Sequence, residues 1–135
     1  MSGKSFVVTN VLLYAMMESD NEKSSRAKSV LTKSNLILSI QVVNELAFNL
    51  LKKSNISEST LSDIIRILFE DFQVVVVDKQ ILFQALELRH KFSFSYWDSL
   101  IVSSAILSGC DILFAEDMQH GLTIHNQLQI VNPFI

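Results

Sequence analysis

The chain has 135 residues, of which 49% are hydrophobic and 19% are charged. This length indicates one domain, residues 1–135, and the composition excludes a disordered protein because enough apolar surface is present to fill a core. The net charge of −3 argues against a strongly basic nucleic-acid binder, although it is compatible with an enzyme that meets phosphate through metal ions. The lone Cys110 excludes a disulfide framework and indicates a reducing, cytoplasmic location.

The apolar run at residues 6–17 raises the question of a membrane segment or a signal peptide. It is too short to span a bilayer, it contains Thr9 and Asn10, and no small-residue cleavage site follows it. We therefore expect no membrane partner.

Short apolar strands alternate with helices along the chain. In chain order the pattern predicts a strand at residues 4–8, helices at 11–16 and 26–33, a strand at 35–39, helices at 40–52 and 60–70, a strand at 74–77, helices at 80–91 and from 98 onward, and strands at 112–115 and, at an edge, 129–131. Thr9-Asn10 is interpreted as a break and Ser24-Ser25 as a helix cap. The alternation predicts an α/β sandwich with a mostly parallel central sheet of four to five strands flanked by helices, which binds ligands at the carboxyl ends of its strands.

The stretch SYWDSLIVSSAILSG, residues 95–109, predicts a central, buried helix, because it is apolar nearly all round and its one charge is Asp98. A carboxylate in such a place needs a partner, since an unpaired buried charge is costly. A helix N-cap explains Asp98 as well as a functional role does.

Further acids border uncharged stretches. Glu45 is the only charge in residues 36–51, and Glu116-Asp117 directly follow the apolar strand at 112–115. Taken singly, Glu45 is explained as a surface glutamate and the pair as an ordinary turn or helix cap. Taken together, carboxylates in one pocket repel unless a cation neutralises them, and oxygen ligands of this kind suit Mg²⁺ or Mn²⁺, which activates water for displacement at phosphorus.

Other chemistries have no motif in this sequence. The histidines, His90, His120 and His125, lack metal-ligand spacing and are predicted to be surface or packing residues. No glycine-rich loop follows a strand, and neither Gly-x-Ser-x-Gly nor a Cys-His pair occurs. The acids therefore carry the functional prediction.

Four segments follow one another along the chain: FVVTNVLLY at residues 6–14, Asn44-Glu45, WDSLI at 97–101 and AEDMQHG at 115–121. In this order and spacing they resemble the PIN domain, and more narrowly the VapC-type ribonuclease toxins of bacterial toxin–antitoxin pairs. The resemblance implies a PIN-like three-layer sandwich and an endoribonuclease that depends on Mg²⁺ or Mn²⁺. It also implies RNA as the substrate, a homodimer, and a cognate antitoxin protein that holds the toxin inactive.

The resemblance assigns roles by position. The catalytic, metal-binding acids are Glu45, Asp98 and Asp117, with Glu116 as an accessory metal-binding acid. Thr9 or Asn10 orders the first loop as a supporting residue.

One position departs from the family. The family has an aspartate, normally a primary metal ligand, directly before the Thr-Asn pair, and this chain has Val8 there. Valine offers no oxygen, so we expect metal binding and ribonuclease activity to be impaired. Three explanations stay open: a naturally degenerate PIN domain, a substitution that disarms a toxic protein, or metal binding that survives on the other acids.

Two alternative functions are compared with the ribonuclease. One is a catalytically inactive PIN-fold module that binds antitoxin or RNA. The other is a phosphoryl-accepting response-regulator domain, which requires adjacent acids after the first strand that Val8-Thr9-Asn10 does not supply. Basic residues either flank an RNA groove or form a solvated face; they are Lys23, Arg26, Lys28, Lys33 and Lys52-Lys53.

Overall fold

The computed structural model describes residues 3–17 and 21–135 of the chain. In chain order the elements are β1 (Ser5–Val7), α1 (Thr9–Met16), α2 (Glu22–Val30), β2 (Leu36–Ser39), α3 (Ile40–Lys53), α4 (Glu58–Asp71), β3 (Gln73–Val75), α5 (Lys79–Phe92), α6 (Tyr96–Leu107), β4 (Ile112–Phe114), β5 (Thr123–Ile124) and β6 (Leu128–Val131).

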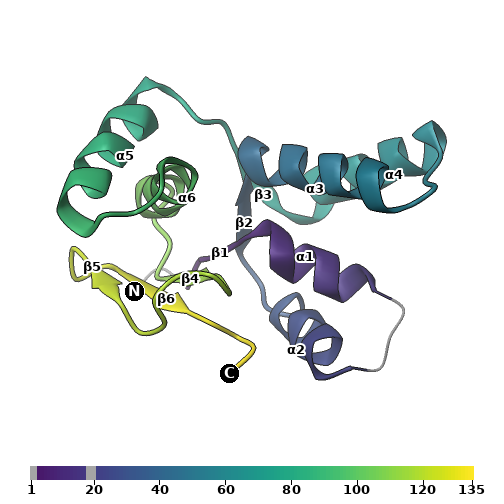
Figure 1. The fold of residues 1–135 in the computed structure, drawn as a ribbon, viewed down its shortest axis with the longest axis horizontal. Helices are drawn as coiled ribbons and strands as arrows, with labels where there is room; N and C mark the ends of the chain where they lie inside the picture. Colours follow the sequence, from purple (N-terminus) through teal and green to yellow (C-terminus); the bar gives the residue numbers. More distant parts are fainter. Residues whose placement is uncertain (1–2, 18–20) are drawn as a thin grey trace.

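The strands form one sheet in the order β3-β2-β1-β4-β6-β5, and only β5 and β6 pair antiparallel (Figure 1). At its centre, Phe6 on β1 is in register with Ile37 on β2 and with Leu113 on β4. All three side chains are buried, as expected for parallel strands that are covered on both faces. The shared direction brings the carboxyl ends of β1, β2 and β4 to one edge of the sheet.

Helices cover both faces of this sheet and give the molecule three layers. Figure 1 shows α1 to α4 on one side of the strands and α5 with α6 on the other. Within α6, every residue from Ser99 to Ile106 is buried, which confirms the predicted central helix. The predicted α/β sandwich around a mostly parallel sheet is therefore confirmed. The strand count is corrected: the described residues form six strands rather than four to five, because the two-residue strand β5 is too short to give a pattern in the sequence. Within residues 3–17 and 21–135, no helix has the length and apolar character that crossing a membrane requires.

The first helix begins earlier than the sequence predicts. Thr9 and Asn10 are the first two residues of α1 rather than a break, so that prediction is wrong. The reason is the backbone of Val8, which already has the extended conformation of an N-cap, with φ −93° and ψ 170°. The chain therefore passes from β1 into α1 within one residue.

The second helix also begins earlier, at Glu22. Its N-cap is Asn21, whose side chain accepts a hydrogen bond of 2.7 Å from the backbone N–H of Ser24. Ser24-Ser25 therefore lies inside the helix and is not the cap. Asparagine and serine cap equally well, so local composition did not separate the two starts.

The last strands differ from the prediction in position. β6 lies between β4 and β5, so it is not an edge strand, and the outer position belongs to the two-residue strand β5. The turn between them has His125 and Asn126 at φ 53° and 52°, and the backbone N–H of Gln127 donates to the carbonyl of Ile124 at 3.0 Å. Turns of this left-handed kind usually contain glycine, and this one has none, so the sequence carried no signal for the hairpin.

Candidate functional site

An acidic cleft of about 190 Å³ opens at the carboxyl edge of the sheet. Its walls come from the junction of β1 and α1, from α3, from the first turn of α6 and from the segment after β4. The structure places every residue of the predicted site in this cleft: Val8, Thr9, Asn10, Glu45, Asp98, Glu116 and Asp117. Segments from both ends of the chain are thus brought together where an α/β sheet binds its ligands.

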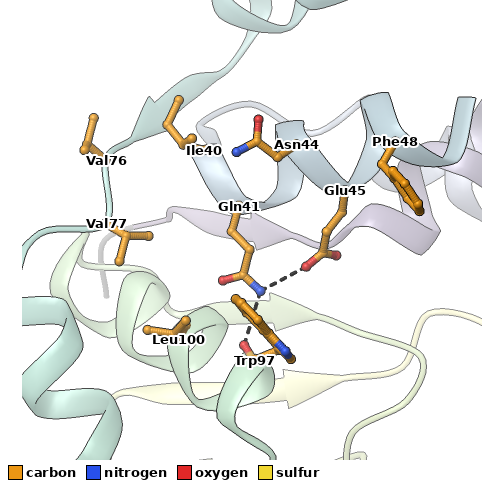
Figure 2. A pocket seen from close by; sticks show the side chains of 9 residues that line it. All are labelled: Ile40, Gln41, Asn44, Glu45, Phe48, Val76, Val77, Trp97 and Leu100. Atoms are coloured by element: carbon orange, nitrogen blue, oxygen red, sulfur yellow. Dashed lines mark hydrogen bonds between the residues drawn. The ribbon is translucent and has the colours of Figure 1, made fainter. Parts of the chain in front are cut away.

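Glu45 is held by two neighbours. Gln41 Nε2 donates to Glu45 Oε1 at 2.9 Å (Figure 2). Thr9 Oγ1 donates to Glu45 Oε2 at 2.8 Å. Gln41 lies one helical turn before Glu45 on α3, whereas Thr9 is the first residue of α1. Both carboxylate oxygens are therefore oriented, and Glu45 is half-buried rather than a free surface side chain.

Asp98 lies in the first turn of α6, but it is not the cap. The N-cap is Ser95, whose Oγ accepts a hydrogen bond of 3.1 Å from the backbone N–H of Asp98. Burial raises the pKa of Asp98; a hydrogen bond with Ser95 opposes this, and the charges of Asp117 and Glu45 raise the pKa further. The three predicted acids therefore act on one another electrostatically across the cleft.

Asp117 is the exposed member of the group. Asn10 Nδ2 donates to Asp117 Oδ2 at 3.2 Å, so the first turn of α1 contacts an acid that follows β4. Thr9 and Asn10, neighbours on α1, thus each hold a different carboxylate. A residue that positions an acid needs a hydrogen bond of this kind to its carboxylate.

Glu116 has partners of its own. Tyr14 Oη donates to Glu116 Oε1 at 2.8 Å, and Lys23 Nζ lies 2.5 Å from Glu116 Oε2. Burial alone would raise the pKa of Glu116, but the hydrogen bonds from Lys23 and Tyr14 outweigh it and hold the pKa below its ordinary value. Lys23, one of the basic residues considered for RNA, is thus the counter-ion of this acid.

Val8 lines the cleft at the position where the resemblance leads us to expect an aspartate. Its side chain offers methyl groups, and no oxygen, to the cleft that Thr9 and Glu45 also line. In the part of the chain that the structure describes, no three His, Cys, Asp or Glu side chains are grouped so that they could hold a metal ion. The donor set of this cleft therefore does not form a complete cation site.

Three residues that bind the acids of the cleft were not predicted as part of the site. Gln41 orients Glu45, and its spacing of four residues on one helix was an available signal. Tyr14 and Lys23 hold Glu116, but 102 positions separate Tyr14 from Glu116, so only the fold brings them together. The histidines, which are His90, His120 and His125, are exposed, in agreement with their predicted surface role.

Fold and cleft together define a class of protein, a three-layer α/β sandwich with carboxylates gathered at the carboxyl edge of a parallel sheet. The family model of the PIN domain matches residues 5–121. The chain therefore belongs to the PIN domain family. No curated protein matches the chain in sequence.

Several solved structures are similar in fold. A toxin–antitoxin complex from Klebsiella pneumoniae matches with a TM-score of 0.73 at 16% identity, over 97% of this chain and 98% of that chain. VapC20 from Mycobacterium tuberculosis, described as a sarcin–ricin loop cleaving toxin, matches with a TM-score of 0.68 at 17% identity, over 84% and 90%. VapBC2 from Rickettsia felis, bound to a DNA fragment from its promoter, matches with a TM-score of 0.67 at 20% identity, over 95% and 98%. At these identities the matches confirm the fold.

Proposed function

We propose that this chain is the toxin of a toxin–antitoxin pair, a PIN-domain endoribonuclease that hydrolyses RNA phosphodiester bonds. The observation that carries the proposal is the cleft in which Glu45, Asp98 and Asp117 meet at the carboxyl edge of the sheet. The similar structures support it, because one is a sarcin–ricin loop cleaving toxin and another is a toxin–antitoxin complex.

In this proposal Glu45, Asp98 and Asp117 are the catalytic acids. Thr9 and Asn10 are positioning residues, since they act through the hydrogen bonds that hold Glu45 and Asp117. The proposed cofactor is Mg²⁺ or Mn²⁺, because like charges around one cleft are stabilised by a small, hard cation with oxygen ligands. Glu116 is the accessory acid, with Lys23 bound to it as long as no cation competes.

We further propose that activity is impaired in this chain because Val8 leaves the cation site without one of its carboxylates. Val8 lines the same cleft as Glu45, Asp98 and Asp117, and an aspartate there would add a fourth carboxylate to these three catalytic acids. By analogy with single groups that stabilise developing charge, the loss of one such group costs about 3–4 kcal/mol, or roughly 10²–10³ in rate.

The proposed partners are RNA, a cognate antitoxin protein and a second copy of the chain. The antitoxin is supported by the similar complexes from Klebsiella pneumoniae and Rickettsia felis, and by VapBC from Salmonella typhimurium, which was solved bound to DNA. The second copy rests on the family resemblance. Co-purification of an antitoxin encoded beside the chain tests the first of these two protein partners.

The decisive experiment compares ribonuclease activity of this chain and of Val8→Asp on a mixed RNA pool, with and without Mn²⁺. We expect Mn²⁺-dependent cleavage by Val8→Asp at a rate about 10²–10³ times that of the unaltered chain. The fold is expected to tolerate the change, because Val8 is the N-cap of α1 and aspartate is among the best N-cap residues.

Val8→Asn is the matched control, since it has the shape and capping ability of aspartate without the charge. It should bind Mn²⁺ weakly and remain slow. Equal rates for the unaltered chain and Val8→Asp would contradict the proposed impairment. If none of the three proteins cleaves RNA although each shows a cooperative thermal unfolding transition, the proposed enzymatic function is contradicted. This result would favour the inactive module that only binds antitoxin or RNA.

A further inference from the structure

An apolar groove of about 670 Å³ lies beside the acidic cleft, between α3 and α6 (Figure 2). Val76, which follows β3, closes its third side. Gln41, Glu45 and Trp97 line both the groove and the cleft, so the two hollows adjoin. A polymer bound with one unit in the cleft therefore reaches the groove with the next.

Two aromatic rings are exposed on the walls of the groove. Phe48 on α3 is 64% exposed and Trp97 on α6 is 63% exposed. Large apolar side chains grouped in one exposed hollow indicate a binding site, whereas isolated ones need no explanation. Rings at such a site are stacking platforms for bases, because every nucleobase has a π-face.

Helix α3 arranges the side chains of this region in one row. Gln41, Glu45, Phe48 and Lys52 are spaced four, three and four residues apart, which places them on one face of the helix. Lys52 Nζ lies 6.0 Å from the centre of the Phe48 ring. Along the row, the acid Glu45 is followed by the ring of Phe48 and then by the cation of Lys52. A ring that can stack on a base and a positive charge that can meet a phosphate therefore lie next to each other.

The groove also contains polar groups that an apolar partner would leave unused. Gln41 Nε2 donates to Glu45 and, at 3.4 Å, to the backbone carbonyl of Trp97, which fixes the orientation of the amide. Gln41 Oε1 is then buried and accepts no hydrogen bond, while the Asn44 side chain beside it is exposed. A nucleobase stacks through its faces and has N–H donors and acceptors on its edges, so it matches this mixture of rings and amides.

We propose that the groove is a subsite for one unpaired nucleobase of a single-stranded RNA, stacked on Trp97 and Phe48 next to the bond that is cut. This inference rests on the proposed function, because it takes the ligand of the adjoining acidic cleft to be RNA. A base that is paired within a duplex cannot offer its face to these rings, so the subsite selects unpaired segments.

Trp97 is the only tryptophan of the chain, and its fluorescence therefore reports directly on the groove. The experiment titrates the protein, in Mg²⁺, with an unstructured single-stranded RNA of about eight nucleotides and with the duplex of the same sequence. We expect the single strand to quench Trp97 and the duplex to leave it unchanged. A gel run after the titration checks that the RNA stays intact.

Phe48→Ala tests the second ring, and Phe83→Ala is its control, since Phe83 is 60% exposed on α5 and lies outside the groove. We expect Phe48→Ala to raise the Kd for the single strand about fivefold to a hundredfold, the effect of losing one stacked base. Phe83→Ala should leave the Kd unchanged.

Four results would overturn the subsite. If RNA binds with unchanged Trp97 fluorescence and with equal affinity to Phe48→Ala, it binds elsewhere, and the proposed function stands. If no RNA binds although Val8→Asp cleaves RNA, the subsite is wrong and the proposed ribonuclease function stands. If no RNA binds and Val8→Asp does not cleave RNA, both proposals are wrong. If Phe48→Ala, but not Phe83→Ala, converts a dimer into a monomer on a sizing column, the groove is the interface between two copies.

Discussion

The partner of each acid decides how much charge that acid offers to a ligand. Thr9, a neutral donor, orients Glu45 and leaves its negative charge in place. Lys23, a cation, holds Glu116 and cancels much of its charge. Two carboxylates of one cleft thus differ in their electrostatic environment, because one has a hydroxyl as its partner and the other an ammonium group.

Cys110 gives a prediction at the scale of one residue. It is fully buried, and burial raises the pKa of its thiol from 9.0 to about 11. Between these values the unfolded chain releases the proton and the folded chain keeps it, so the free energy of unfolding falls as the pH rises. We expect this fall between about pH 8 and about pH 10 to be smaller by about 1 kcal/mol in Cys110→Ala, measured by urea unfolding.

Tyr14 and Lys23, which also titrate at alkaline pH, are present in both proteins, so the difference between the two isolates the thiol. The same loss of stability in both proteins would contradict a raised pKa for Cys110.

At the scale of elements, the helices of this fold differ in how their first turns are capped. Side chains cap α4 and α6, where Ser57 and Ser95 accept a hydrogen bond from the backbone N–H three residues later. No side chain caps α1, whose N-cap is Val8. Val8 therefore gives neither an acid to the cleft nor a side-chain cap to α1. One aspartate at this position would supply both.

Ser95→Ala should lower the free energy of unfolding by about 1 kcal/mol, the usual cost of losing a serine N-cap. Ser57→Ala is the matched control, because it removes the same kind of cap from α4, away from the cleft. Urea unfolding should give a similar loss for both variants. Only Ser95→Ala should change the fluorescence of Trp97, which lies in the turn that Ser95 caps.

Equal fluorescence changes in the two variants would contradict this assignment, since Ser57 caps α4 and not the turn that holds Trp97 and Asp98.

At the scale of the whole molecule, the sheet is what assembles the cleft. Its acids come from segments that follow β2 or flank β4, and Thr9 and Asn10, which hold two of these acids, follow β1. These three strands are neighbours in the sheet although far apart in the chain. The strands are short, so their hold on one another comes chiefly from buried side chains on both faces. Loss of the core should therefore open the cleft and unfold the protein in one step.

Leu113→Ala in the middle of β4 should lower the free energy of unfolding by about 2–5 kcal/mol, since Leu113 is 0% exposed and its loss leaves a cavity. Ile67→Ala removes a comparable aliphatic side chain that is 51% exposed on α4 and should change stability by about 0.5 kcal/mol or less. Urea unfolding followed by circular dichroism measures both. Similar losses for the two variants would show that the sheet interior is not the core on which the fold depends.

The amino-acid sequence by itself determined the fold class and the identity of the acids. Hydrophobic periodicity and β-branched runs are local signals, and they predicted the alternating elements and the buried helix that follows Asp98. Charge is also local, so Glu45 and Asp117 could be recognised from the uncharged stretches beside them. The sequence likewise determined what Val8 cannot do, because the chemistry of a side chain does not depend on the fold.

The tertiary structure alone decided which groups meet. Tyr14 and Lys23 reach Glu116 across about a hundred positions of the chain, and the groove beside Trp97 exists only because α3 and α6 lie next to each other. The order of β5 and β6 in the sheet was likewise decided by a long-range contact, the parallel pairing of β6 with β4. Such contacts depend on long-range packing, whose free energy is a sum over many weak interactions, and no local pattern records that sum.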